Sequence, residues 1–495
     1  MQPLFSPLYR QVSNLPNLTL FVMFCSILSI LIKVIKFLNK YIMIHIIKYN
    51  VYFLLNIKVI DMLMSFSVDN FRSICKEQKL SFVSDKATEL ENNACSITNN
   101  NKIRLLKSCV IYGANASGKS NLLKALATMK NIITSNREVN SELPVVPFLL
   151  DPATRNAPSL FEVNISIAGD RFQYGFSCTK EKIINEWLYE YPHLTGKRRT
   201  WFERLYDQGS KNYDWNVTNN IKGTKTVWVE TTRENVLFLS NAVSLNCVSL
   251  KPLFDFFSTG IAIVLSTNFF PPIFTTDMAL HNNKEEILNF LKAADLKITD
   301  FKIKKEKVDY QNIKGQLPEQ IRESIEKNPD NLMSINIKTI HSDKIGNQIE
   351  FDLERDESDG TKKLFQFAGP FIDVLKNGRV LVVDELNISL HPFLMKFLVE
   401  LFHNENTNPK CAQLLVTTHE TSIMTQDIFR RDQIWFTKLN SCQMTELFPL
   451  TDFKPLKGSS KERLEVKYFK GKYGALPYID VFQFEQILNE YFSVK

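Results

Sequence analysis

Clustered metal ligands are lacking in this sequence of 495 residues. The cysteines include no Cys-x-x-Cys pair, and the few histidines are not grouped with them. A structural zinc site needs four such ligands at short spacings, so nothing in the sequence indicates one. Scattered cysteines are typical of a reducing compartment, and we expect a cytoplasmic protein. The eight cysteines are Cys25, Cys75, Cys95, Cys109, Cys178, Cys247, Cys411 and Cys442.

Acidic residues are absent from the first 60 positions, which contain six Lys or Arg. Residues 61–495 therefore carry 54 basic and 53 acidic side chains, a net charge of +1, although the whole chain has a formal charge of +7. Global charge gives no argument for nucleic-acid binding. The composition, 44% hydrophobic and 23% charged, is typical of a globular chain that can form a large core.

A clear membrane-spanning run is also missing. The candidate, LTLFVMFCSILSILI at residues 18–32, has fifteen uncharged residues, whereas a spanning helix needs about 20. Three interpretations remain open: a short anchor, a signal peptide, or an extension outside the working protein. A signal peptide is the least favoured because no small-residue cleavage site follows. We favour the third, because patterned sequence begins at Met62 or Met64; residues 1–61 are then dispensable, and membrane association is not expected.

A phosphate-binding loop is the first chemical signal in the sequence. Residues 111–126, IYGANASGKSNLLKAL, fit the pattern G-x-x-x-x-G-K-[ST]. An apolar stretch at 105–112 predicts a buried strand before the loop, and apolar spacing after it predicts a helix. This arrangement directs backbone N–H groups and a helix N-terminus at an anion. Lys119 is expected to reach the β- and γ-phosphates and Ser120 to bind Mg²⁺. The expected nucleotide-binding residues here are Gly113, Asn115, Ala116, Ser117, Gly118, Lys119, Ser120 and Asn121.

Two later apolar strands end in polar residues that could complete the site. RVLVVDEL at residues 379–386 ends in Asp384 and Glu385, and AQLLVTTHETSIM brings His419 to a strand end. The carboxyl ends of parallel strands are where such folds bind ligands. We expect Asp384 to hold Mg²⁺, Glu385 to act as general base, and His419 to contact the γ-phosphate.

A third segment, ESDGTKKLFQF at residues 357–367, predicts a helix start with Ser358, Gly360 and Thr361 exposed to an anion. An ordinary N-cap is the alternative interpretation. We expect this helix to be interrupted at Gly369-Pro370.

Hydrophobic patterning divides the rest of the chain. We predict a hairpin after Met64, antiparallel strands at 160–178 and at KTVWVE (225–230), helices from about 234 to 330, and strands at SINIKTIH and QIEFDLER. The predicted domains are the extension 1–61, the first half of a nucleotide-binding head at 62–233, a helical insertion at 234–335, the second half at 336–450, and a basic tail at 451–495.

The basic tail is open to two interpretations. Residues 454–472 hold seven Lys or Arg against two Glu, with Tyr468, Phe469 and Tyr473 interleaved. Such a run is commonly a solvated face. Alternatively, it is a docking surface for an acidic partner or a nucleic-acid backbone.

The order of these motifs resembles that of ABC-type ATPase heads, found in transporters, chromosome-maintenance and repair ATPases. More narrowly, GANASGKSNLLKAL, ESDGTKKLF, VVDELNISLHP and TTHET resemble bacterial AAA-type ATPases related to the ATPase part of OLD (overcoming lysogenization defect) proteins, RloA-like and abortive-infection ATPases among them. The resemblance implies an α/β ABC-ATPase-like P-loop head, with a mixed sheet, an attached antiparallel β subdomain and an inserted helical region.

The same resemblance implies ATP and Mg²⁺ as cofactors and a homodimer. In such dimers, the Ser-Gly motif of one head closes over the γ-phosphate bound to the other. It also implies Mg-dependent ATP hydrolysis that controls a separate effector, such as a Toprim-like, HNH or RloB-type protein, in antiphage defence.

Two rival functions and three departures from the family pattern remain. A nuclease within this chain is disfavoured, because only 76 residues follow His419 and they contain no Asp-x-Asp pair. No glutamine occupies the segment LPVVPFLLD (143–151), where ABC proteins place one. Asn387 stands where relatives commonly have an acid, and Leu390-His391 replaces a transporter-like Leu-Asp, which disfavours a transporter subunit.

Overall fold

The computed structural model describes residues 61–97, 103–265, 272–307, 315, 322, 333–454 and 463–477. The predictions for residues 1–60, including the apolar run at 18–32, lie outside the described residues. Within the described residues, no helix combines the length and apolar character that a membrane span requires.

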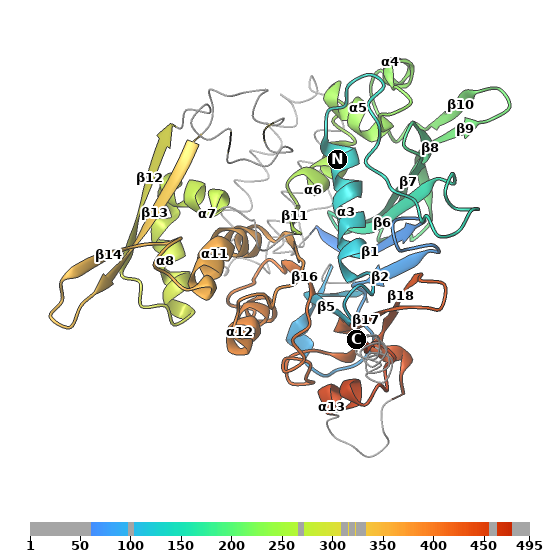
Figure 1. Cartoon of the computed structure of the whole chain (residues 1–495). Helices are drawn as coiled ribbons and strands as arrows, with labels where there is room; N and C mark the ends of the chain where they lie inside the picture. The colour runs from blue at the N-terminus through green and yellow to red at the C-terminus, as the bar shows by residue number, and fades with distance from the viewer. Residues whose placement is uncertain are drawn as a thin grey trace, which may run out of the picture. The chain divides into compact units, whose positions relative to one another are not determined.

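A six-stranded sheet forms the centre of the unit that spans residues 59–495 (Figure 1). Its strand order is β11-β15-β16-β5-β17-β18, and all neighbours are parallel except the last pair. The strands are β11 (Ile261–Val264), β15 (Val380–Val383), β16 (Gln413–Thr417), β5 (Ser108–Gly113), β17 (Ile434–Leu439) and β18 (Thr445–Pro449). The buried strands predicted at 105–112, 379–386 and after Ala412 are confirmed.

Alternate residues of the central strands face two different cores. Ile111 and Val382 belong to one core, whereas Val110 and Leu381 belong to the other, as the two-residue period of a strand requires. Helices α3 (Lys119–Thr134) and α6 (Lys251–Ser258) cover the first face. Helices α8 (Lys284–Ala293), α11 (Asp359–Asn377) and α12 (Pro392–His403) cover the second.

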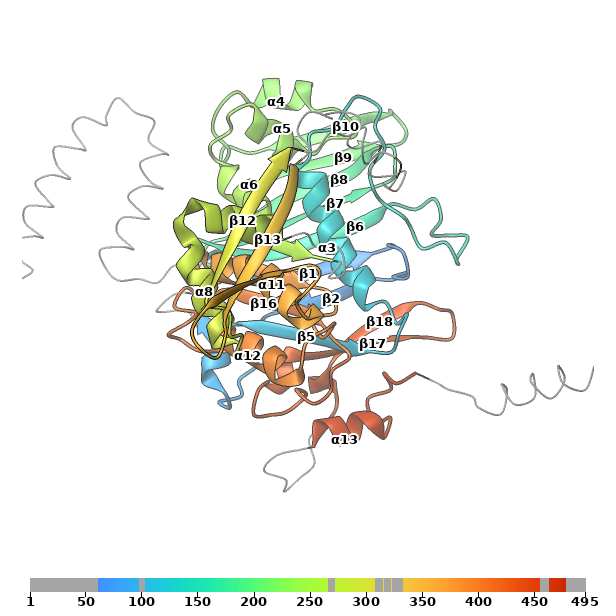
Figure 2. The ribbon, with the colours of Figure 1, turned by 60° about the vertical axis from the view of Figure 1, so that its left-hand side comes forward.

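A seven-stranded antiparallel sheet packs on the side of α3 that faces away from the central sheet (Figure 2). Its order is β10-β9-β8-β7-β6-β1-β2. The strands are β1 (Met62–Asp69), β2 (Gln78–Ser81), β6 (Ser159–Ile167), β7 (Asp170–Cys178), β8 (Ile183–Tyr191), β9 (Arg199–Asp207) and β10 (Asn212–Val217). The hairpin after Met64 and the antiparallel strands at 160–178 are therefore confirmed.

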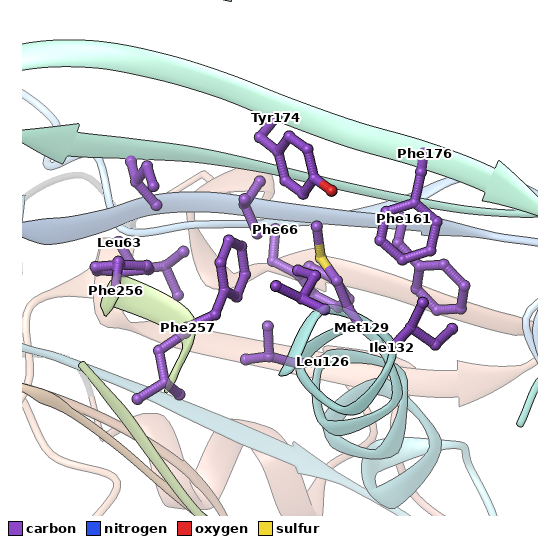
Figure 3. Packing of buried hydrophobic residues seen from close by; sticks show 14 of the residues in the cluster. Leu63, Phe66, Leu126, Met129, Ile132, Phe161, Tyr174, Phe176, Phe256 and Phe257 are labelled. Atoms are coloured by element: carbon purple, nitrogen blue, oxygen red, sulfur yellow. The ribbon is translucent and has the colours of Figure 1, made fainter. Parts of the chain in front are cut away.

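Helix α3 joins the two sheets through one shared core. Figure 3 shows Leu126, Met129 and Ile132 of α3 beneath Phe161 and Tyr174 of the antiparallel sheet. Because α3 begins directly at the phosphate loop, both sheets fix the position of that loop.

The segment predicted as a helical insertion, 234–335, also contains strands. It includes α5 (Phe238–Ser244), α6, α7 (Ile273–Met278), the π-helical turn η2 (Ala279–Asn283) and α8, but also β11 of the central sheet. Strand β12 (Asp300–Lys307) pairs with β13 (Met333–Ser342), which pairs with β14 (Gln348–Asp352), in a separate antiparallel sheet. The strands predicted at SINIKTIH and QIEFDLER are confirmed, and the segment predicted as a helical insertion holds β11 and β12 besides its helices.

The strand predicted at KTVWVE is wrong, because these residues form α4 (Lys225–Thr231). Trp228 is buried, and its carbonyl accepts a hydrogen bond from the Asn241 side chain of α5 at 3.0 Å. Packing on α5 therefore overrides the strand preference of the β-branched residues.

The interruption predicted at Gly369-Pro370 is also wrong, because α11 runs continuously through Pro370. Proline cannot donate to the carbonyl four residues earlier, which belongs to Gln366. The Thr275 hydroxyl of α7 donates to that carbonyl instead, at 3.0 Å. Gly369 permits this approach, because a Cβ there would lie 2.8 Å from the Thr275 Cα.

The remaining described elements are short. Turn η1 (Glu91–Asn93) leads into β3 (Ala94–Ser96), which pairs with β4 (Arg104–Leu106), and η5 (Arg431–Gln433) and η6 (Leu450–Asp452) flank β17 and β18. Cys95 and Cys411 form a disulfide, although their spacing in the sequence did not mark them as a pair.

The described part of the basic tail forms α13 (Leu464–Phe469) and is packed on the head. Tyr468 and Tyr473 are buried against Phe436, with ring centroids 5.8 and 5.0 Å away. Of the three interleaved aromatic residues, Phe469 alone is exposed. The two tyrosines are therefore core residues rather than part of a docking surface.

Candidate nucleotide-binding site

Three adjacent parallel strands bring the predicted motifs to one edge of the central sheet. Strand β16 lies between β15 and β5, so the segments that follow these three strands are neighbours. The phosphate loop (residues 113–120) follows β5, Asp384 and Glu385 follow β15, and His419 follows β16. The strand order thus brings these three strand ends together, at the edge where such folds bind ligands.

Close packing holds the phosphate loop against β17 and β18. The Ser117 and Thr437 hydroxyls are 2.6 Å apart, and the Thr445 hydroxyl donates to the Ser117 carbonyl at 3.2 Å. Gly118 has φ +100°, and a Cβ there would overlap the Thr445 side chain. A Cβ at Gly113 would lie 2.5 Å from the Thr437 carbonyl oxygen. Both glycines are therefore required by space, and Gly118 also by its backbone conformation.

Lys119 is buried at the first position of α3 and faces the loop. Its Nζ donates to the carbonyls of Gly113 and Ala114, each at 2.9 Å. Burial lowers the pKa of Lys119 to about 8, although the nearby charges of Glu385 and Asp384 act to raise it. An anion bound in the loop would add acceptors for this ammonium group and favour its charged form.

A cavity of about 330 Å³ lies beside the loop and the strand ends. Its lining comprises Asn115, Ala116, Ser117, Gly118, Lys119, Ser120, Asn121, Glu385 and His419. The structure therefore brings most of the predicted nucleotide-binding residues together with the predicted base and the predicted histidine. Asp384 directly precedes Glu385 of this lining, and Gly113 lies two residues before Asn115.

Thr417, a residue that the sequence analysis missed, holds the two acids in place. Its buried hydroxyl donates to Asp384 Oδ1 at 2.5 Å and accepts from the Glu385 backbone N–H at 2.7 Å. Glu385 has φ +53°, a left-handed conformation that is uncommon for a residue with a side chain. This bend directs the chain away from β15 immediately after Asp384. The position of Thr417 just before Thr418-His419 is the signal that could have revealed it.

Asn387 links the segment after β15 to the segment that carries His419. Its Oδ1 accepts from the Thr418 hydroxyl at 3.0 Å and from the His419 backbone N–H at 3.2 Å. An amide oxygen makes these two bonds without adding a charge beside Asp384. The pKa of His419 is lowered, first by partial loss of hydration and then by the charge of Lys119, so the neutral imidazole is favoured.

The residues present fit a magnesium ion bound together with phosphates. Mg²⁺ prefers oxygen ligands, keeps several waters and commonly takes one or two protein groups plus substrate oxygens. Ser120 and Asp384 offer such oxygens at the same sheet edge. Across the described ranges, no three or more His, Cys, Asp or Glu side chains are grouped to hold a metal ion alone.

The predicted Ser-Gly turn (residues 358–361) begins α11 and does not line this cavity. Ser358 is the N-cap: its hydroxyl accepts from the Thr361 backbone N–H at 3.2 Å, so the alternative N-cap interpretation also holds. Gly360 lies against the segment after β15, because a Cβ there would be 3.1 Å from the Ser389 carbonyl oxygen.

The segment 143–151, which lacks the expected glutamine, packs against the turn after β1. Phe148 is buried, and its N–H donates to the Asn70 side chain at 2.9 Å. The same turn reaches the site, because the Asn121 side chain donates to the Ser73 hydroxyl at 2.7 Å. Asn121 thereby connects the start of α3 to the antiparallel sheet.

A family model described as "AAA domain, putative AbiEii toxin, Type IV TA system" matches residues 109–229 and 266–425. These ranges include the phosphate loop, the Ser-Gly turn, both acids and His419. The chain belongs to this family. The family is one of P-loop ATPase domains, so ATP is the expected ligand of this chain.

No curated protein matches the chain. Among solved structures, it is similar to an SMC head domain from Thermotoga maritima, with 12% identity, a TM-score of 0.35, and coverage of 78% of this chain and 98% of that chain. It is also similar to the recombination mediator protein RecF of the RecFOR pathway, with 14% identity, a TM-score of 0.34, and coverage of 79% and 99%.

Proposed function

We propose that this protein is a Mg²⁺-dependent ATPase whose heads dimerise on ATP and control a separate effector. The observation that carries the proposal is the cavity in which the phosphate loop, Glu385 and His419 meet. Backbone N–H groups of the loop and the N-terminus of α3 bind the phosphates, and Lys119 adds a positive charge. The metal ion, when bound, neutralises developing charge on the phosphate oxygens.

Each side chain has one defined task in hydrolysis. Glu385 accepts a proton from the attacking water as general base, and His419, kept neutral, hydrogen-bonds the γ-phosphate. Asp384 and Ser120 hold the metal ion. The Thr417 hydroxyl binds both the carboxylate of Asp384 and the backbone N–H of Glu385, so the base and the metal ligand keep a fixed position relative to each other.

The test separates phosphate binding from hydrolysis. We expect Lys119→Ala to lose ATP binding, because the buried cation is removed. Glu385→Gln should keep ATP bound and slow turnover by about 10²- to 10⁴-fold, the usual contribution of a general base. Binding is measured with a fluorescent ATP analogue and turnover by phosphate release. Equal loss of ATP binding in both variants would contradict the role of Glu385.

The Ser-Gly turn supports a composite site between two subunits. It lies outside the lining of the cavity in its own chain, as expected if Ser358, Gly360 and Thr361 close over ATP held by a second copy. Gly360→Glu should then abolish hydrolysis and leave ATP binding near normal, because the carboxylate would face the partner's γ-phosphate. Dimers should accumulate with ATP in the Glu385→Gln background.

A role in antiphage or abortive-infection defence, through a separate effector such as a Toprim-like, HNH or RloB-type protein, agrees with the toxin and toxin–antitoxin terms of the family description. The alternative is a nucleic-acid-processing activity of this chain. Arg463, Lys470 and Lys472 remain exposed around α13 and could contact a phosphate backbone. Oligonucleotide binding through them, weakening steeply as salt concentration rises, is expected only under the alternative, and this separates the two candidates.

A further inference from the structure

The residue before the Ser-Gly turn is held by the separate three-stranded sheet. Glu357 immediately precedes Ser358, and its side chain is only 11% exposed. Its Oε1 accepts hydrogen bonds from the Thr339 hydroxyl and from His341 Nε2, the latter at 2.7 Å. Both donors belong to β13, the central strand of the β12-β13-β14 sheet.

These donors are themselves fixed by packing. Thr339 is fully buried, and the His341 ring packs edge-on against Phe351 of β14, with centroids 5.0 Å apart. Ile337 of the same strand and Phe301 of β12 belong to the core shared with α11. The Glu357 carboxylate therefore binds to a strand that cannot shift without disturbing that core.

The Ser-Gly turn is thus held from two directions. On one side, Glu357 ties it to β13. On the other side, Gly360 rests against the Ser389 carbonyl, close in sequence to the acids of the nucleotide site. Only the first of these contacts connects the turn to the three-stranded sheet.

We propose that Glu357 is a positioning residue that sets the Ser-Gly turn for the nucleotide of the opposite subunit. This inference rests on the proposed function, because it requires a composite site. The carboxylate acts only as an acceptor for Thr339 and His341, and it touches neither ATP nor water in the reaction. Its loss lets the turn move, and a displacement of about 1 Å can cost about 10²-fold in rate.

Three substitutions at one contact test this role. Glu357→Ala should lower kcat by about 10²-fold and leave ATP binding by the full chain unchanged, since the residue lies outside the cavity. Glu357→Gln should restore most of the rate, because its amide oxygen still accepts both hydrogen bonds. Thr339→Val should also lower kcat, but by less than Glu357→Ala does, because the hydrogen bond from His341 to Glu357 remains.

The matched control is Glu350→Ala on β14. Glu350 is a carboxylate of the same sheet that pairs with Lys302 and Lys338 on the exposed face, at 2.7 and 3.1 Å. Surface pairs of this kind contribute little, so kcat should not change. If Glu357→Gln is as slow as Glu357→Ala, or if Glu350→Ala is equally slow, the positioning role is overturned.

A mixing experiment asks whether Glu357 acts on the opposite subunit. Glu357→Ala mixed with Lys119→Ala should recover hydrolysis, because each heterodimer then contains one site with an intact loop and an intact turn. Gly360→Glu mixed with Lys119→Ala is the benchmark. Recovery in the benchmark alone overturns the inference about Glu357 and keeps the proposed function, whereas failure of both mixtures overturns the composite site and the inference with it.

Discussion

At the scale of single residues, the charge on Lys119 depends on pH within an accessible range. Burial lowers its pKa to about 8 before phosphate binds, and bound phosphates must raise it because they favour the ammonium form. ATP binding therefore takes up a proton above pH 8. We predict that ATP affinity is constant from pH 7 to about 8 and then falls by up to about tenfold per pH unit. Titration calorimetry in buffers of different ionisation enthalpy measures both effects.

Lys363 provides the control for this prediction. Burial also lowers its pKa to about 8, but it lies on α11 and does not line the cavity. Lys363→Met should therefore keep the pH dependence of ATP affinity. Equal affinity at pH 7.5 and about 9.5 in the unmodified protein would show that Lys119 is not the group that binds the phosphates.

The sequence reveals the site residues whose spacing along the chain is set by the ligand. It does not reveal the roles of residues that act only through contacts between neighbouring strands. The loop glycines, Lys119 and the two acids follow local patterns, because their task requires a fixed order along the chain. Thr417 and Asn387 have no such pattern. Their roles arise from hydrogen bonds between segments about thirty residues apart, which exist only once β15 and β16 pair.

At the scale of elements, α11 continues through Pro370 because another helix replaces the missing hydrogen bond. We predict that Thr275→Val lowers the free energy of unfolding by about 1–3 kcal/mol, because the Gln366 carbonyl loses its donor. Pro370→Ala in that background should recover part of the loss, since alanine restores the backbone N–H. Urea unfolding of the two single variants and the double variant gives the coupling.

Thr276→Val is the matched control for this cycle. Thr276 is equally buried, but its hydroxyl donates within its own helix to the Ile273 carbonyl at 2.8 Å. Pro370→Ala should not rescue it. Additive effects of Thr275→Val and Pro370→Ala would contradict the replacement of the helix hydrogen bond by Thr275.

Most elements were predictable where they carry a long or repeated hydrophobic pattern, as in β6, β7, α3 and α8. Short elements were not. Helix α4 has seven residues, too few to show a helical period, and its Val and Trp residues favour a strand locally. Strand β11 has four residues, and its place beside β15 depends on a pairing across more than a hundred residues. Tertiary contacts therefore decide these cases.

At the scale of the whole molecule, one buried polar network joins segments from both ends of the described chain. The His403 ring at the end of α12 is 2.8 Å from the Ser108 hydroxyl of β5, which also accepts from the Gln433 amide at 2.7 Å. The Asn93 side chain donates to Gln433 at 2.8 Å. The network lies at the start of β5, the end opposite the phosphate loop, and it holds four elements together there.

Burial, with a smaller contribution from the charge of Lys107, lowers the pKa of His403 to about 3. Below pH 6.5, His403 binds a proton in the unfolded chain, whereas in the folded protein it stays neutral until about pH 3. The free energy of unfolding must therefore fall as the solution is acidified. We predict a loss of about 1 kcal/mol per pH unit below pH 6.5 from this residue. His403→Gln removes the titrating group, so urea unfolding from pH 7.5 to 5 should show a shallower decline in the variant.

Above pH 7, His403 is neutral in both the folded and the unfolded state, and the two pH profiles should run parallel there. An identical decline in both proteins below pH 6.5 would mean that His403 is protonated in the folded state, and that the network tolerates a buried charge.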